Sequence, residues 1–254
     1  MSIPANTAAS ALATTWVHFI AAIPDGWARH EGGVVAGITG VAIPTLNGVW
    51  PEKIELDPVL VSEFLDQVAN SGVPYCLQLR PGAPEQLSTL AADRGMIKED
   101  QIPLMVLEDS GRLQATQKVA GLVIRQLSPE EAVLHATVAA QGFEVPEAPF
   151  IQLMTPSLLL RPGVRCYVGE VDGEVVTTGL GATLGPFVGI FNIATPPEHR
   201  GQGFGAAVTA RAVSDGFADG AQWSYLQSSL AGYNIYTRLG FATVERWDCW
   251  VTES

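Results

Sequence analysis

Apolar residues recur along the chain with two kinds of spacing, and these spacings predict alternating helices and strands. At 57–69, for example, apolar positions return every three or four residues, as on one buried face of a helix. This helix has Asp57 as its N-cap and Pro58 at its first helical position. In the first half of the chain we predict helices at 1–30, 57–69 and 84–94 and strands at 33–43, 73–79 and 102–107.

The periodicity is lost in the polar segment 108–118, and a second series of elements begins after it. We therefore expect two domains, 1–118 and 119–254. Because both mix helices with strands, the expected fold class is α/β (α+β), with a mixed central sheet flanked by helices. In the second half we predict strands at 122–127, 165–171, 174–184, 187–194, 223–228 and 243–251, helices at 128–141, 146–160, 203–218 and 230–239, and a tight hairpin at Asp172-Gly173.

The composition is that of a folded, acidic protein. Hydrophobic residues make up 47% of the 254 residues and charged residues 16%, which excludes wholesale disorder. A net charge of -12 leaves no basic footprint, so we expect no nucleic-acid partner. The acidic surface mildly favours a cationic substrate through electrostatic steering.

Cysteines, histidines and the N-terminal region exclude further classes. Cys76, Cys166 and Cys249 are far apart and form no disulfide framework, and the four histidines have no metal-binding spacing, so we expect no metal. A signal peptide begins with a positively charged region, but no basic residue precedes Arg29. Polar residues also interrupt every apolar run before the roughly 20 residues that span a bilayer. We expect a cytoplasmic protein with no membrane partner.

The chemically informative segment is 193–206, where an apolar strand is joined to a helix by a loop with three glycines at alternate positions. Small residues let a ligand approach the backbone, and the start of a helix offers unpaired N–H groups to an anion. Arg200 adds a positive charge beside them. The segment therefore predicts a site for a diphosphate.

Three phosphate-binding patterns compete for this segment. A P-loop is excluded because no lysine follows the glycines. Gly201, Gly203 and Ala206 fit the loose spelling of a dinucleotide fold, but the pattern is not in the first strand-to-helix turn and too little chain follows it. The third pattern, R-x-x-G-x-G at 200–205, resembles that of the GNAT superfamily of acyl-CoA-dependent N-acyltransferases.

Two further segments resemble the same family. The strand that ends at Ile193, Ala194 and Thr195 is similar to the family's splayed strand, whose free backbone groups pair with the pantetheine arm of CoA. Residues 236–241, YTRLGF, match Y-x-x-x-G-F, in which the tyrosine lies near the sulfur of acyl-CoA. The resemblance covers roughly residues 120–254 and implies a GNAT fold for them.

The resemblance also implies roles for individual residues. Acetyl-CoA is the implied cosubstrate, and Tyr236 is the implied general acid, which protonates the departing thiolate when an amine attacks the thioester. Many members carry an asparagine seven residues before this tyrosine; that position is Ser229 here, which can still hydrogen-bond the pantetheine. The implied cofactor-binding residues are Ile193, Ala194, Thr195, Arg200, Gly201, Gln202, Gly203, Phe204, Gly205, Ala206 and Ser229.

No residue stands out as the general base. Glu144 and Glu147 lie where the family admits its substrate, and a proton relayed by water is an alternative to either. Glu198 and His199 are expected as solvated loop residues. Tyr236 has an alternative reading too, as a helix residue whose ring packs in the core.

The first half has no R-x-x-G-x-G motif. Its order of strands and helices still resembles the closing part of a GNAT fold, and residues 91–96 stand where Y-x-x-x-G-F would be, without the tyrosine. We interpret 1–118 as a smaller, degenerate GNAT-like α/β domain that binds no CoA. An unrelated α/β cap is the alternative.

The resulting hypothesis is an N-acetyltransferase that moves an acetyl group from acetyl-CoA to the primary amine of a small molecule or peptide. Two alternatives stay open: a non-catalytic module that binds or senses acyl-CoA, and a tandem acyltransferase similar to mycothiol synthase. No motif indicates the acceptor, the acyl chain length or the oligomeric state, and a homodimer is left open.

Overall fold

The computed structural model describes residues 3–116 and 119–253, and its contacts group the chain into two compact units. The C-terminal unit is Met105–Ala242, and the N-terminal unit joins Ile3–Leu104 to the chain from Thr243 onward. The boundary between the units therefore falls within the strand Ile97–Leu107, and the last strand, Ala242–Val251, belongs almost entirely to the N-terminal unit. None of the described helices has the length and apolarity needed to cross a membrane.

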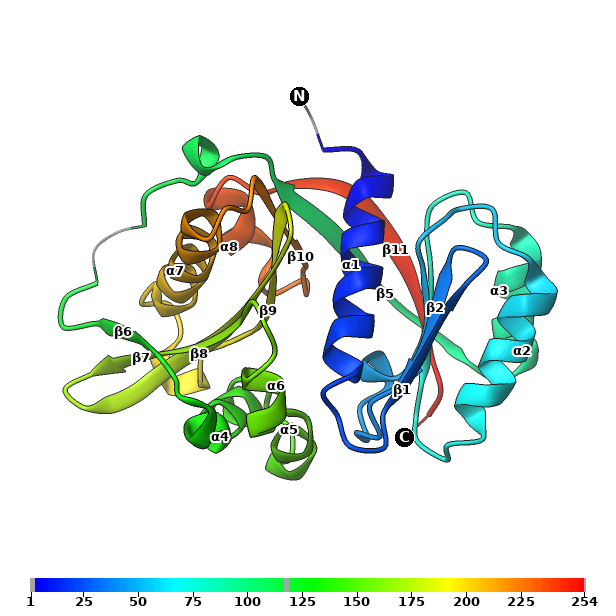
Figure 1. The fold of residues 1–254 in the computed structure, drawn as a ribbon, viewed down its shortest axis with the longest axis horizontal. Helices are drawn as coiled ribbons and strands as arrows, with labels where there is room; N and C mark the ends of the chain where they lie inside the picture. Colours follow the sequence, from blue (N-terminus) through cyan, green and yellow to red (C-terminus); the bar gives the residue numbers. More distant parts are fainter. Residues whose placement is uncertain (1–2, 117–118, 254) are drawn as a thin grey trace. The chain divides into compact units, whose positions relative to one another are not determined.

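In the N-terminal unit, helices cover a mixed sheet with the strand order β1-β2-β3-β4-β11-β5 (Figure 1). Strands β1 to β3 are antiparallel neighbours, β3 and β4 are parallel, and β11 runs antiparallel to β4. The elements are α1 (Ala5–Ile20), β1 (Trp27–Glu31), β2 (Val34–Ile38), β3 (Gly48–Pro51), α2 (Pro58–Ala69), β4 (Cys76–Leu79), α3 (Glu85–Asp93), β5 (Ile97–Leu107) and β11 (Ala242–Val251).

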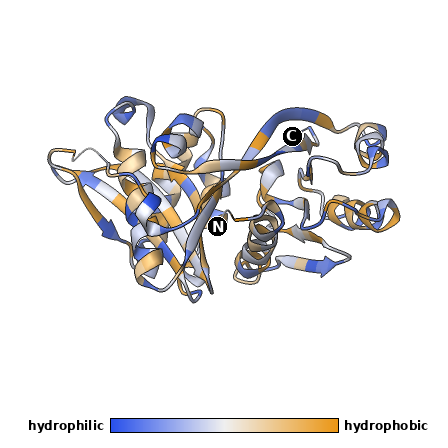
Figure 2. Ribbon diagram, turned by 90° about the horizontal axis from the view of Figure 1, so that it is seen from above, coloured by the Kyte–Doolittle hydropathy of each residue, from blue (hydrophilic) through white to orange (hydrophobic). Residues whose placement is uncertain are grey.

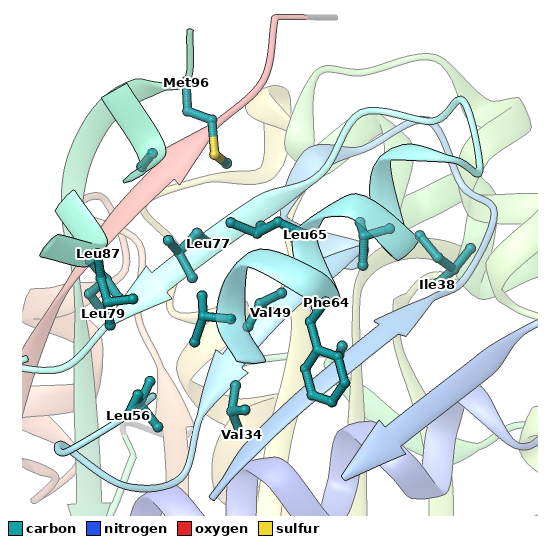
Figure 3. Packing of buried hydrophobic residues seen from close by; sticks show 14 residues of the cluster. Val34, Ile38, Val49, Leu56, Phe64, Leu65, Leu77, Leu79, Leu87 and Met96 are labelled. Carbon is teal, nitrogen blue, oxygen red and sulfur yellow. The ribbon is translucent and has the colours of Figure 1, made fainter. Parts of the chain in front are cut away.

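Helix α2 forms as its sequence predicts. The Asp57 carboxylate accepts a hydrogen bond from the Val59 N–H at 2.9 Å, and Pro58 occupies the first helical position. The buried face of α2 includes Phe64 and Leu65, which join side chains of β2, β3 and β4 in one hydrophobic cluster (Figure 3). The predicted N-cap of this helix is confirmed.

In the C-terminal unit the strand order is β5-β10-β9-β8-β7-β6. Strands β6 to β9 are antiparallel neighbours, and β9 is parallel to β10. Along the ribbon, helices and strands carry both hydrophobic and hydrophilic residues (Figure 2). The elements are β6 (Val123–Gln126), α4 (Ala132–Phe143), α5 (Glu147–Leu153), α6 (Pro156–Leu159), β7 (Val164–Val171), β8 (Glu174–Leu184), β9 (Phe187–Ala194), α7 (Phe204–Ala218), β10 (Trp223–Gln227) and α8 (Tyr233–Arg238).

Helices α4 and α7 cover opposite faces of this sheet. The side chain of Thr178 in β8 is hydrogen-bonded to His135 of α4, whereas a Cβ added at the next residue, Gly179, would contact Val208 of α7. Successive residues of a strand point to opposite faces, so the two helices lie on different sides. The α/β (α+β) fold with a mixed sheet flanked by helices is confirmed.

The structure differs from the predicted elements in several places. The helix predicted at 1–30 ends at Ile20, because Pro24 and the positive φ of Asp25 do not fit a continuing helix, and residues 27–31 form the strand β1 instead. The strands β1 and β3 were not predicted, because β1 is a largely exposed edge with the sequence WARHE and β3 has only four residues. The helix predicted at 146–160 is divided into α5 and α6, and Pro156 begins the second piece. The hairpin is as expected, with Asp172 and Gly173 both at positive φ.

The compact units do not follow the boundary at 118 and 119. Met105 and Leu107, at the end of β5, are buried in the core of the C-terminal unit, while nearly all of β11 is grouped with the N-terminal unit. Of the predicted linker, residues 117 and 118 lie outside the described residues. The division into domains 1–118 and 119–254 stays a prediction. The contacts within the structure place the boundaries at 104/105 and 242/243 instead.

The two halves of the sequence repeat one order of elements. β2-β3-α2-β4-α3-β5 in the first corresponds to β8-β9-α7-β10-α8-β11 in the second, and in each an antiparallel pair is followed by a parallel one. The ends of α3 and α8 are also alike: the Met96 N–H donates to Ala91 O at 3.1 Å, and the Phe241 N–H donates to Tyr236 O at 3.0 Å. This agreement supports the interpretation of the first half as a repeat of the second.

Candidate active site

The glycine-rich loop ends on the uncapped start of α7. Gly203 is the N-cap residue with a φ of 88°, and no side chain accepts a hydrogen bond from the first turn. Gly201 also has a positive φ, of 79°, which only glycine adopts readily. In the described chain, no main-chain N–H between Arg200 and Ala207 donates to a backbone carbonyl, so the donors of residues 201–206 are available to an anion.

Strand β9 separates from its parallel neighbour before it reaches this loop. The register between β9 and β10 ends where Gly189 faces Tyr225, although β9 continues to Ala194. Beyond that point, among the described residues, the edge of β9 that faces β10 has no strand partner, and this is the splayed arrangement that the family resemblance implied. A strand edge of this kind offers N–H and C=O groups to an extended ligand.

The splayed end of β9 is locally irregular. Its register with β8 shifts between Thr178 and Leu180, and Asn192 has a φ of 49°. Gly179 leaves room beside it for the Ile193 side chain, because a Cβ at Gly179 would clash with that side chain. Backbone strain of this kind is often found at functional sites.

The guanidinium of Arg200 is bound by protein groups rather than directed into the loop. It donates to Gly142 O at 2.8 Å and to Thr195 O at 3.2 Å, and it pairs with the Glu144 carboxylate at 2.7 Å. Arg200 therefore holds the loop against the C-terminal end of α4, where a positive charge also suits the helix dipole. Its predicted contact with a phosphate stays a prediction.

Helix α4 approaches β9 closely at Gly142. A Cβ at this position would lie 2.8 Å from both the Ala194 Cβ and the Thr195 nitrogen, so only glycine fits without displacement. From the other side of Thr195, the Thr177 hydroxyl donates to Ala194 O at 2.9 Å. These contacts set the position of the predicted pantetheine-binding residues.

Tyr236 lies on α8 with its ring packed at one edge of the unit's core. The ring is half-buried and meets that of Phe241 edge-to-face, with centroids 6.2 Å apart. Removal from water raises the pKa of Tyr236 to about 12, so the hydroxyl is protonated at neutral pH. Within the part of the chain that the structure describes, no hydrogen bond involves this hydroxyl. It is thus a free proton donor on a fixed ring.

Ser229 stands just before α8 and its side chain is engaged there. Its exposed hydroxyl oxygen accepts a hydrogen bond from the Gly232 N–H at 3.2 Å. The serine hydrogen is not used by this contact. Ser229 can therefore still donate to a ligand, as the sequence suggested.

The acidic residues proposed as bases lie beside this site, with different partners. Glu144 pairs with Arg200, whereas Glu147 accepts a hydrogen bond from the Thr137 hydroxyl. His199 pairs with Glu174 at 3.4 Å. Neither carboxylate is placed against the hydroxyl of Tyr236 by these contacts, and no base is identified by them.

Several residues near the site had not been singled out from the sequence. Gly142 and Asn192 matter because of their backbone positions, which only the meeting of α4 with β9 reveals. His135 is buried beneath β8, where burial lowers its pKa to about 3. Among the described residues, no group of three or more His, Cys, Asp or Glu side chains could hold a metal ion.

Comparison with known proteins agrees with this geometry. Residues 130–241 match the acetyltransferase (GNAT) family. The matched segment contains the splayed strand, the glycine-rich loop and Tyr236. The similarity to the GNAT family therefore lies in residues 130–241.

Relatives extend this likeness over most of the chain. An uncharacterized N-acetyltransferase of Bacillus subtilis (strain 168), YobR, is 22% identical over 205 residues, which are 78% of this chain and 81% of the relative. A GCN5-related N-acetyltransferase from Kribbella flavida shares the fold with a TM-score of 0.72 at 20% identity, over all of this chain and 97% of the other.

A tandem GNAT protein from the clavulanic acid biosynthesis pathway also has a similar fold. Its TM-score is 0.57 at 14% identity, over 91% of this chain and 84% of the other chain. Tandem GNAT architecture is therefore compatible with the present fold. These structural likenesses concern the fold, and the repeat of elements described above is a property of this chain itself.

Proposed function

We propose that the C-terminal unit is an N-acetyltransferase that uses acetyl-CoA and acts on a primary amine. One observation carries the proposal: an unpaired strand edge leads directly into a helix start whose N–H groups are free. An extended arm that ends in a diphosphate fits both parts at once, because the strand edge suits the arm and the helix start suits the anion.

Particular residues would hold the cosubstrate. Ile193, Ala194 and Thr195 would bind the pantetheine through their backbone, with Ser229 donating from the far side. Residues 201–206 would bind the pyrophosphate through their N–H groups. The positive φ of Gly201 and Gly203 supports this fit, since a side chain at either position would strain the loop.

The chemistry proposed is direct attack of the amine on the thioester carbonyl. A C–N bond forms, the C–S bond breaks, and the sulfur leaves as a thiolate that Tyr236 protonates as general acid. The pKa of Tyr236 is about 12, whereas a thiol ordinarily has a pKa of about 8.5. Transfer of the proton from the phenol to the thiolate therefore costs about 5 kcal/mol. The hydroxyl must therefore recover a proton from the amine nitrogen as the bond forms, which makes Tyr236 a relay between the two atoms.

The described residues of the N-terminal unit offer no second site of this kind, and we propose that this unit binds no CoA. Its counterpart of α7 is α2, where the Asp57 carboxylate already occupies the helix start and Pro58 has no N–H to donate. A negative charge at that position would repel a diphosphate. Ala91, which stands in the place of Tyr236, is fully buried in the core.

Binding is tested first. Isothermal calorimetry with acetyl-CoA should give a dissociation constant that Gly203→Val raises by at least tenfold, because a valine at a φ of 88° distorts the helix start. Gly72→Val is the matched control, since Gly72 also has a positive φ but follows α2 in the other unit. Equal binding by the wild type and the Gly203 variant would contradict the proposed cradle.

Turnover is tested next, by release of free thiol in the presence of a panel of amines. Tyr236→Phe should lower kcat by at least a hundredfold with little change in acetyl-CoA affinity. Tyr233→Phe, which removes a hydroxyl from the same helix, is the control. If the wild type binds acetyl-CoA but acetylates no amine, the non-catalytic sensor is the better description. One observation favours the sensor: the side chains of Ser229 and Arg200 are both hydrogen-bonded to protein groups.

A further inference from the structure

Three exposed apolar side chains lie at the junction of α4 and α5. Phe143, Val145 and Ile151 are 44%, 39% and 43% exposed, respectively. The ring of Phe143 stacks on that of buried Phe150, with centroids 5.6 Å apart and planes inclined by 5°. The outer face of Phe143 is thus a flat aromatic surface held in place from behind. We call Phe143, Val145, Phe150 and Ile151 the aromatic patch.

The segment that carries the patch is fixed to the candidate site at two points. Immediately before Phe143, Gly142 packs on Thr195 and accepts a hydrogen bond from Arg200. Shortly after Ile151, the Met154 sulfur lies 3.9 Å from the Asn192 amide nitrogen on the splayed end of β9. The patch therefore adjoins the strand end on which the thioester would lie.

A carboxylate without a basic partner lies in the same segment. Glu144 is neutralised by Arg200, whereas Glu147 receives only the Thr137 hydroxyl and forms no ion pair within the described residues. Glu147 and Ile151 are four residues apart on α5, so they share one side of the helix. An exposed negative charge therefore stands beside exposed apolar surface.

We propose that the acceptor is a hydrophobic primary amine with an aromatic ring on a short alkyl chain, and that the aromatic patch binds its ring. This inference rests on the proposed function and names its substrate class. The ring would stack on Phe143 beside Val145 and Ile151, and the ammonium group would approach Glu147 before it loses its proton and attacks. A polyamine or an amino sugar would leave the apolar surface in contact with water, so such amines bind less tightly.

The experiment measures binding and turnover separately on the full chain. Calorimetry with CoA-saturated protein uses 2-phenylethylamine, spermidine and ethanolamine, and the same amines are then assayed for acetylation. We expect the lowest dissociation constant and the lowest KM for 2-phenylethylamine. Phe143→Ala and Glu147→Gln should each raise both values about tenfold for that amine. Neither variant should change acetyl-CoA affinity.

Two comparisons make the result specific. Val123→Ala removes a comparably exposed apolar side chain from β6 and should change nothing. For 2-phenylethanol, which has the ring but no charge, Phe143→Ala should weaken binding and Glu147→Gln should not.

The inference is overturned if spermidine or ethanolamine is preferred, if no amine binds the CoA complex, or if neither patch variant alters binding. Acetylation of any amine in those cases leaves the proposed function intact. Failure to bind acetyl-CoA at all would overturn the proposed function and this inference with it.

Discussion

Acid should destabilise the C-terminal unit through one buried histidine. His135 has no exposed surface, and its Nδ1 lies 2.6 Å from the Thr178 hydroxyl oxygen. That hydroxyl already donates to Tyr167 O at 2.8 Å, so Nδ1 must carry the hydrogen. Its Nε2 is buried and has no hydrogen-bond partner in the described structure. A second proton there would place an unpaired charge in the core.

The size of the effect follows from the pKa. Burial lowers the pKa of His135 from 6.5 to about 3. Between these values the unfolded chain binds more protons than the folded one, so the free energy of unfolding decreases as the pH decreases. The slope approaches about 1.4 kcal/mol for each pH unit once the unfolded histidine is fully protonated, and it is half of that at pH 6.5, which gives about 2 kcal/mol lost between pH 6.5 and pH 4.5. Below pH 3 the folded state is protonated as well, and this contribution stops growing.

Hydrogen exchange read by mass spectrometry measures this locally. Peptides from α4 and β8 should lose protection between pH 6.5 and 4.5, after correction for intrinsic exchange rates. His135→Gln keeps an amide donor near Thr178 but cannot be protonated, so the free energy of opening should fall by about 2 kcal/mol less over this window than in the wild type. Because the variant keeps every carboxylate, the difference between the profiles isolates His135. Parallel profiles for the two proteins would refute the reasoning.

Two further predictions concern how the chain is held together. The Arg80 side chain has no exposed surface and pairs in two hydrogen bonds with Glu245 of β11, so Glu245→Met should cost about 3–5 kcal/mol in a urea titration. The double variant with Arg80→Met should recover part of that loss, and an equal or larger loss in the double variant would contradict the account. A fragment of residues 119–254 should give no cooperative thermal transition, because it lacks Met105 and Leu107 of its own core and the strand β4 that pairs with β11. A sharp melt by circular dichroism would show that this unit folds without them.

Local features of the fold were predictable because they depend on neighbours in sequence. The hairpin at Asp172-Gly173 needs two residues that tolerate positive φ, and the start of α2 needs a capping side chain followed by proline. The anion-binding property of the glycine-rich loop could likewise be predicted from consecutive residues, since small residues before a helix leave N–H groups free. Each prediction required only a few consecutive positions.

Other features of the site depend on segments far apart in the chain. Arg200 was expected beside the phosphates, but Gly142 O and Glu144, more than fifty positions earlier, hold its guanidinium. The need for glycine at position 142 could not be predicted from the sequence either, because it arises from the close approach of α4 to Thr195. Periodicity shows that a helix has a buried face, but it does not show which strand the helix meets.

The sequence by itself determined the mixed fold, the family-like loop and strand, and the tyrosine that follows them. Only the tertiary structure decided that β5 contributes to the core of the C-terminal unit, that β11 pairs with β4, and that an aromatic patch adjoins the end of β9. The physical reason is the separation in sequence over which the interactions act. Turn and cap preferences act between adjacent residues, whereas strand partners and exposed patches are set by which apolar surfaces the whole chain can bury together.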